Sequence, residues 1–106
     1  MNKILILTLA TLSISVSASA SEQGPDAKAG KMKAYTCQFC HGINGKALKP
    51  DYPNISGQNE MYLNSSMKAY QNGERAGPMG AMMKQQLSSL NDQDIADIAA
   101  YYAKMD

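Results

Sequence analysis

Both cysteines and the only histidine of the 106-residue chain lie in one short segment, Cys37-Gln38-Phe39-Cys40-His41. A disulfide between these two cysteines would close so short a loop that it would remove little entropy from the unfolded chain. A structural zinc site needs about four ligands, and no second pair of cysteines or histidines completes one. A thioredoxin-like redox pair requires a βαβ setting, but the chain after residue 20 has no valine and no run of alternating β-branched residues. The segment therefore argues against all three kinds of site.

The spacing C-x-x-C-H is that of a covalent haem attachment site. One turn of helix brings two thiols to the two vinyl groups of a haem, and the next residue directs its imidazole at the iron. We therefore predict that Cys37 and Cys40 attach a haem c and that His41 binds its iron. Because the motif occurs once, one haem per chain is expected.

Large aliphatic side chains are scarce after residue 20, where the sequence has eight Leu and Ile residues and one Phe. A domain of this size buries a low share of its surface and often needs a disulfide, a metal or another group to complete its interior. A haem is a large apolar disc, and it would supply the missing interior. The thin core and the motif thus favour the same cofactor.

The start of the chain has the pattern of a secretory signal peptide. An apolar run over 4–12 is followed by small residues at Ala18 and Ala20, which fit a cleavage site. The run is shorter than the roughly 20 residues that a membrane-spanning helix needs, and no later stretch approaches that length. We expect a signal peptide over 1–20, export to the periplasm, and a single domain over 21–106.

Three helices are indicated by capping residues and apolar spacing. Asp26 is a suitable N-cap for a helix that runs to about residue 35. A second helix is expected over 59–72, with Gly73 as its stop. The clearest helix begins after Asn91, where Asp94 completes a capping box. The intervening segments 42–58 and 73–80 are predicted to be loops.

A haem iron bound by one histidine needs a sixth ligand, and methionine is the candidate. The chain after residue 20 contains seven methionines, most of which are expected to fill gaps in the core. The loop 73–80 brings Met79, Met82 and Met83 onto one short stretch. Each of these three sulfurs is a candidate ligand.

The arrangement of these segments resembles the class I cytochromes c, and within them the small bacterial periplasmic monohaem type. The matching segments are CQFCHG, YPNISGQ, a methionine-rich stretch and LNDQDIADIAAYYA, which in order and spacing cover nearly all of residues 21–106. The resemblance implies an all-α fold in which the N- and C-terminal helices cross over one covalently bound haem. It also implies little access of solvent to the iron.

The resemblance assigns roles to individual residues. It implies thioether bonds at Cys37 and Cys40 and a proximal ligand at His41, whose ring would donate a hydrogen bond to the carbonyl of Pro53. Gly30 and Tyr101 resemble the small residue and aromatic ring that meet where the terminal helices cross. Arg75 is a candidate partner for a haem propionate because of its place before the ligand loop.

The resemblance also ranks the three methionines. Similar proteins have the ligand in the pattern M-x6-L-S/N-D, which here falls on Met83, with Leu90, Asn91 and Asp92 after it. Met79, which follows Pro78, and Met82 remain competitors, because a small slip would present a different sulfur.

The expected function is electron transfer by an outer-sphere mechanism, with redox proteins as donor and acceptor and no substrate chemistry. The alternatives are a haem subunit of a larger oxidoreductase, and a haem sensor or enzyme whose methionine leaves the iron. The absence of a second histidine disfavours peroxide chemistry.

After residue 20, nine basic and nine acidic residues balance, so neither nucleic acid nor an anionic membrane is an expected partner. A monomer or weak dimer is expected. Lys46, Lys49 and Lys84 could form a docking rim, but the balanced charge favours ordinary solvated lysines.

Overall fold

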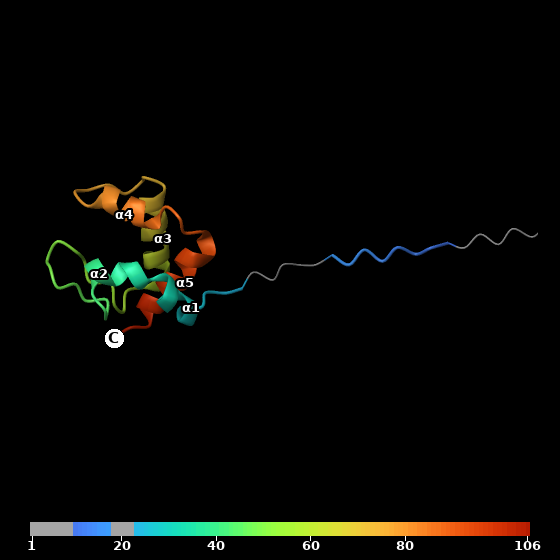
Figure 1. Cartoon of the computed structure of the whole chain (residues 1–106), viewed down its shortest axis with the longest axis horizontal. Coiled ribbons are helices and arrows are strands. Elements are labelled where there is room, and N and C mark those ends of the chain that lie inside the picture. The colour runs from blue at the N-terminus through green and yellow to red at the C-terminus, as the bar shows by residue number, and fades with distance from the viewer. Residues whose placement is uncertain (1–9, 18–22) are drawn as a thin grey trace, which may run out of the picture.

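The computed structural model describes residues 10–17 and 23–106 (Figure 1). The cleavage site expected at the end of the signal peptide, and most of its apolar run, lie outside these residues. In the described part the chain forms helices and no strand, and none of its helices is long and apolar enough to cross a membrane. The elements are α1 (Ala27–Lys33), the short 3-10 helix η1 (Tyr35–Cys37), α2 (Gln38–His41), α3 (Glu60–Gln71), α4 (Gly80–Leu87) and α5 (Asp92–Ala103).

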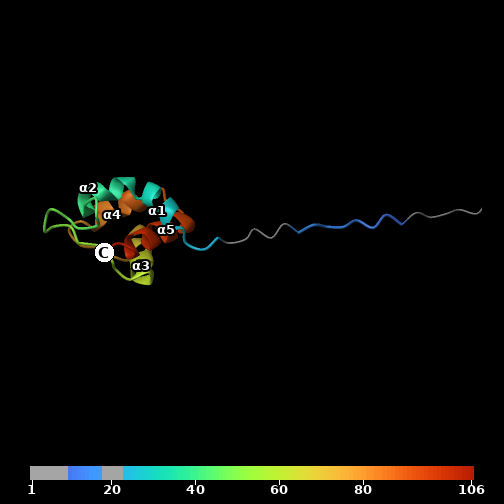
Figure 2. The same ribbon diagram turned by 90° about the horizontal axis from the view of Figure 1, so that it is seen from below.

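Helices α1 and α5 pack against each other at a point where α1 has no side chain (Figures 1 and 2). The atoms closest to Gly30 belong to the backbone of Asp97 and Ile98, and a Cβ at Gly30 would overlap the carbonyl oxygen of Asp97. The terminal helices therefore cross at Gly30 as expected. Tyr101, on the same helix α5, packs against the hydrophobic core and lines a groove together with Lys31 and Ala34.

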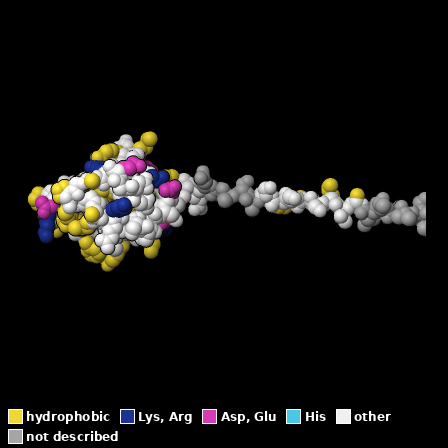
Figure 3. All heavy atoms as spheres, turned by 90° about the horizontal axis from the view of Figure 1, so that it is seen from above, with side chains coloured by type: hydrophobic (Ala, Val, Ile, Leu, Met, Phe, Trp, Pro, Cys, Tyr) yellow, Lys and Arg dark blue, Asp and Glu magenta, His cyan; other side chains and the backbone are white. Residues whose placement is uncertain are grey.

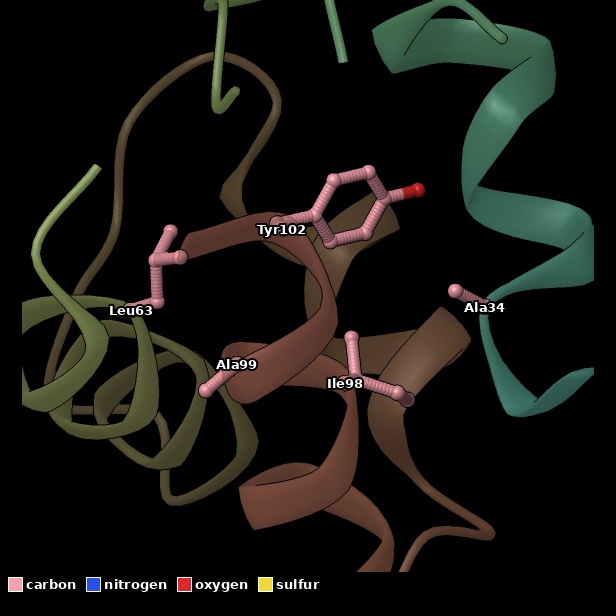
Figure 4. Close-up of a cluster of buried hydrophobic side chains, with 5 residues drawn as sticks. All are labelled: Ala34, Leu63, Ile98, Ala99 and Tyr102. Atoms are coloured by element: carbon pink, nitrogen blue, oxygen red, sulfur yellow. The ribbon is translucent and has the colours of Figure 1, made fainter. Parts of the chain in front are cut away.

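The core is small and is built around α5. Ile95 and Ile98 are fully buried there. The side chains of Ala34, Leu63, Ile98, Ala99 and Tyr102 converge from the end of α1, from α3 and from α5 (Figure 4). Few large side chains fill the interior, which agrees with the scarcity of aliphatic residues in the sequence.

The predicted helix ends agree closely with the structure. Asp26 accepts hydrogen bonds from the amides of Lys28 and Ala29, and α3 begins after Asn59, whose side chain accepts from the Tyr62 amide. Gly73 follows α3 with a φ of 76°, which suits glycine. The capping box of Asn91 and Asp94 is present, with backbone-to-side-chain distances of 3.0 and 2.8 Å.

Helix α4 was not predicted. The residue before it, Met79, has no side chain that can cap a helix, and glycine and proline dominate the segment that leads into it. The helix spans only eight residues, of which Gly80 and Leu87 are buried. Short helices owe most of their stability to packing, so local sequence signals miss them.

A buried carboxylate fastens α1 to α5. The Asp97 side chain is 3% exposed, and it accepts hydrogen bonds from Lys33 Nζ at 2.7 Å, the Asp26 amide at 2.8 Å and Gln93 Nε2 at 2.8 Å. Lys33 also pairs with Asp94 at 2.8 Å. Burial by itself would raise the pKa of Asp97, but these donors outweigh it and hold the pKa below its usual value.

The variant Asp97→Asn is expected to lower the free energy of unfolding by about 1–3 kcal/mol at neutral pH, because a charged acceptor of several hydrogen bonds is lost. A carboxylate whose pKa is lowered by folding stabilises the protein above its unfolded pKa of about 3.9 and loses that effect as the pH falls through its folded pKa. The difference between wild type and variant should therefore shrink in acid. Urea unfolding at pH 7 and pH 3 measures it, and an equal difference at both pH values would contradict the assignment.

Candidate functional site

The two cysteines lie on η1 and α2 and are not joined to each other. Both thiols are free and half-buried. Burial raises the pKa of the Cys37 thiol, although backbone hydrogen bonding and the Tyr102 hydroxyl oppose the effect. Reactive redox cysteines have a lowered pKa instead. The structure thus gives no support to a disulfide or a thioredoxin-like pair, and it leaves both sulfurs available for covalent attachment.

His41 ends α2 and is held by the loop that follows. Its side chain is buried, with the residue 8% exposed, and its Nδ1 lies 2.9 Å from the carbonyl oxygen of Pro53. A carbonyl can only accept, so Nδ1 carries the proton and Nε2 keeps its lone pair for a metal. The hydrogen bond expected between His41 and Pro53 is therefore present.

The loop 42–58 folds back so that Pro53 reaches this ring. Gly42 leaves α2 with a φ of 82°, and a side chain there would collide with the backbone of Lys46. The carbonyl of Gly45 then accepts from the amides of Ile55 and Ser56, at 2.8 and 3.0 Å. These contacts close the loop just after Pro53 and fix the position of its carbonyl.

The three candidate methionines do not share one environment. Met79 and Met83 are half-buried, and the Met83 amide donates to the Met79 carbonyl at 3.2 Å. Residues four apart lie on one face of a helix. Met82 is 41% exposed and lies on another side of the turn. Helix α4 occupies the same end of the fold as α2 in both ribbon views (Figures 1 and 2).

Gln71, at the end of α3, holds the far end of α4. Its Nε2 donates to the carbonyls of Leu87 and Leu90, each at 2.8 Å. These carbonyls lie at the end of α4 and just before α5, so one amide group ties three helices together. No motif in the sequence marked this residue, because a glutamine near a helix end is usually solvated.

Replacing Gln71 with leucine is expected to lower the free energy of unfolding by about 1–3 kcal/mol, because two part-buried carbonyls lose their donor. Thermal or urea unfolding measures the change. Gln86→Leu is the matched control, since Gln86 is an exposed glutamine on α4. Equal stability of the two variants would show that the contacts of Gln71 contribute nothing.

The remaining candidate residues lie at the surface. Arg75 is exposed, with its guanidinium 4.9 Å from the centre of the Tyr70 ring and Nη1 3.5 Å from the Tyr62 hydroxyl. The hydrogen bond with the Arg75 guanidinium holds the pKa of the Tyr62 hydroxyl below its usual value. The lysines of the suggested rim are exposed as well, and within the described residues none of them pairs with an acid. These are Lys46, Lys49 and Lys84.

The donor set of this site fits a covalently bound haem. Two unlinked thiols, one buried imidazole with a fixed tautomer and half-buried thioether sulfurs are the groups that haem c attachment and axial ligation require. Within the described residues, no group of three or more His, Cys, Asp or Glu side chains could hold a metal ion by itself. The two thiols, the imidazole and the thioether sulfurs are thus the groups that would hold a haem c.

Comparison with known proteins agrees with this chemistry. Residues 27–106 match the cytochrome c family. Cytochrome c-554(548) of Halomonas halodenitrificans is 51% identical over 81 residues, which are 76% of this chain and 98% of that protein. Cytochrome c4 of Pseudomonas aeruginosa is 42% identical over 97% of this chain, but the match spans only 48% of its own length.

The fold is also that of a solved cytochrome c4 structure. The crystal structure of reduced recombinant cytochrome c4 from Pseudomonas stutzeri superposes with a TM-score of 0.69 and 36% identity, over 78% of this chain and 47% of that one. The helical architecture is thus that of the class I cytochromes c, as the sequence predicted. The chain belongs to the cytochrome c family and is a haem c electron-transfer protein.

Proposed function

We propose that this protein is a periplasmic one-electron carrier, with haem c attached through Cys37 and Cys40 and the iron held between His41 and Met83. The observation that carries the proposal is the 2.9 Å hydrogen bond from His41 to Pro53, beside two unlinked thiols. When bound, the haem supplies an iron that cycles between its ferrous and ferric states.

His41, held by the Pro53 carbonyl, would bind the haem iron. The Pro53 carbonyl fixes the ring orientation and the tautomer, so Nε2 is the nitrogen directed away from the loop. A ring held in this way would bind the iron of a haem without having to reorient.

Met83 is the residue that we propose would hold the iron together with His41. It matches the pattern M-x6-L-N-D, and its half-buried position on α4 suits a ligand better than the exposed position of Met82. A thioether is a soft ligand that favours the reduced state and raises the potential. Met79 shares the face of Met83 and is the remaining competitor. Arg75 is proposed to reach a haem propionate, for which it would exchange its contacts with the tyrosines.

Export of the chain through a signal peptide over 1–20 is part of the proposal, and it would place the carrier among periplasmic redox proteins. The partners are proposed to be proteins that dock near the attachment cysteines and exchange electrons without binding to the iron. No substrate reaction is assigned to the chain.

A spectroelectrochemical titration tests the function. The purified protein is expected to be oxidised and reduced reversibly, with a one-electron slope of about 59 mV per decade. Carbon monoxide at neutral pH should leave the reduced spectrum unchanged, because both axial positions are filled. A spectrum altered by carbon monoxide would instead support a sensor or enzyme.

A further inference from the structure

The start of α4 lacks the features that normally hold a helix end. Met79 precedes the helix without a capping side chain, and the first turn contains no acidic residue. Gly80, the first residue of the helix, has a low intrinsic helix propensity. The local sequence therefore does not fix this end of α4.

Ion pairs do not hold the start of α4 either. Charged side chains are sparse on the face drawn in Figure 3, and the ion pairs of the described residues join α5 to α1 and to α3, without a residue of α4. Gln71 fastens the other end of the helix through the carbonyls of Leu87 and Leu90. The start of α4 is therefore positioned by packing.

The packing at this point comes from the ring of Tyr70. Tyr70 is half-buried near the end of α3, and Gly80 is buried beside it. A Cβ at Gly80 would lie 3.7 Å from Cε1 and 4.0 Å from Cδ1 of that ring, and 3.5 Å from the carbonyl oxygen of Arg75. These are ordinary van der Waals distances, so the gap between Gly80 and the ring has room for no more than a methyl group. Tyr70 and Gln71 are neighbours in the sequence and thus hold opposite ends of α4.

The Tyr70 ring is itself held in place. The chain turns back at the end of α3, where the amides of Glu74 and Arg75 both donate to the carbonyl of Ala69, at 2.8 and 3.1 Å. The Arg75 guanidinium lies over the Tyr70 ring, 4.9 Å from its centre, and a cation in this position is attracted by the ring face. Gly80 contacts the ring directly, so that contact does not depend on the Arg75 side chain.

The positions of both half-buried methionines depend on Gly80. Met79 is its neighbour in the sequence, and the Met83 amide donates to the Met79 carbonyl at 3.2 Å, which closes the first turn of α4. A shift of Gly80 would therefore displace both sulfurs. A ligand to a metal must be held within about 0.5 Å of its productive position by its surroundings. The ring that supports Gly80 thus acts on either candidate ligand.

We propose that Tyr70 is a positioning residue for the methionine ligand, because its ring supports the start of α4 and so keeps the sulfur on the iron. The inference rests on the proposed ligation of the iron by a methionine of this stretch, and it holds for Met83 and for Met79. Without the ring, the fraction of molecules whose sulfur has left the iron would rise. A competing ligand binds in proportion to that fraction, so its apparent affinity measures the effect of the ring.

The test titrates the oxidised, haem-loaded protein with imidazole, which competes with the thioether for the iron, and follows the weak red absorption band of iron–sulfur bonding. Tyr70→Ala is expected to bind imidazole at least about tenfold more tightly than wild type. Tyr70→Phe keeps the ring and should behave as wild type. Tyr62→Ala is the matched control, because it removes an exposed tyrosine from the same helix and should also bind imidazole as wild type does.

A second measurement separates positioning from stability. Urea unfolding is followed in the same samples by the red band and by far-ultraviolet circular dichroism. In Tyr70→Ala the midpoint for loss of the band should fall further below the midpoint for loss of helix than it does in wild type. Asp97→Asn weakens the contact of α1 with α5 instead, so it should shift both midpoints together and leave the affinity for imidazole unchanged.

Each outcome decides the question. If Tyr70→Ala binds imidazole as wild type does, or Tyr62→Ala tightens binding equally, the inference is wrong although the carrier function stands. Tight binding by Tyr70→Phe would also overturn it, because the ring would then not be the group that acts. If Tyr70→Ala does not fold, Tyr70→Leu takes its place with the same expected direction. A wild type without the red band overturns methionine ligation and the inference with it.

Discussion

Replacing Met83 with alanine is expected to remove the weak red absorption band of iron–sulfur bonding from the oxidised protein. The variant should also bind carbon monoxide when reduced, because one axial position is then open. Since a thioether stabilises ferrous iron, the reduction potential should fall by on the order of 0.1 V, within the range of about 0.8 V that axial ligands span. Optical spectra and a redox titration of the same sample measure all three effects.

Met79→Ala and Met82→Ala are the matched controls, because they remove a methionine from the same stretch. Both should retain the band. A band that survives in Met83→Ala but disappears in Met79→Ala would make Met79 the ligand, which its half-buried position on the same face permits. Absence of the band from wild type would argue against methionine ligation altogether.

The double variant Cys37→Ser/Cys40→Ser is expected to carry no covalently attached haem and to lose much of its helical structure. The physical reason is the thin interior, in which Ile95 and Ile98 are the largest fully buried side chains. A domain this small needs another apolar group to complete its core. Haem staining after denaturing electrophoresis and far-ultraviolet circular dichroism measure attachment and folding.

Phe39→Ser is the control for this experiment. It changes an exposed residue between the two cysteines and leaves both thiols in place, so covalent haem and helical structure should be retained. Haem that remains covalently bound in the double serine variant would contradict thioether attachment at these positions. A fully helical double variant would contradict the role of the haem in completing the core.

Much of the fold could be predicted because its signals are local. The helix N-caps are Asp26, Asn59 and Asn91. Their side chains accept hydrogen bonds from backbone amides two or three positions away, so a few neighbouring residues specify each helix start. The attachment motif is equally local. The family resemblance added the bond from His41 to Pro53, which the structure contains.

Other features could not be predicted because they depend on distant residues. Helix α4 has no capping side chain and is held by packing and by Gln71, which comes from α3. Asp97 looks like an ordinary surface acid in the sequence, but the crossing at Gly30 buries it against α1. Residues far apart in the chain supply its hydrogen-bond donors, so no local pattern reveals the network.

The sequence by itself determined the chemistry of this protein, because Cys37, Cys40 and His41 are neighbours whose spacing alone specifies haem attachment. The tertiary structure decided which surroundings those residues receive. It separated the exposed Met82 from Met79 and Met83, and it placed the Tyr70 ring beside Gly80 at the start of α4. Exposure is set by which helices pack together, and short-range spacing carries no information about that.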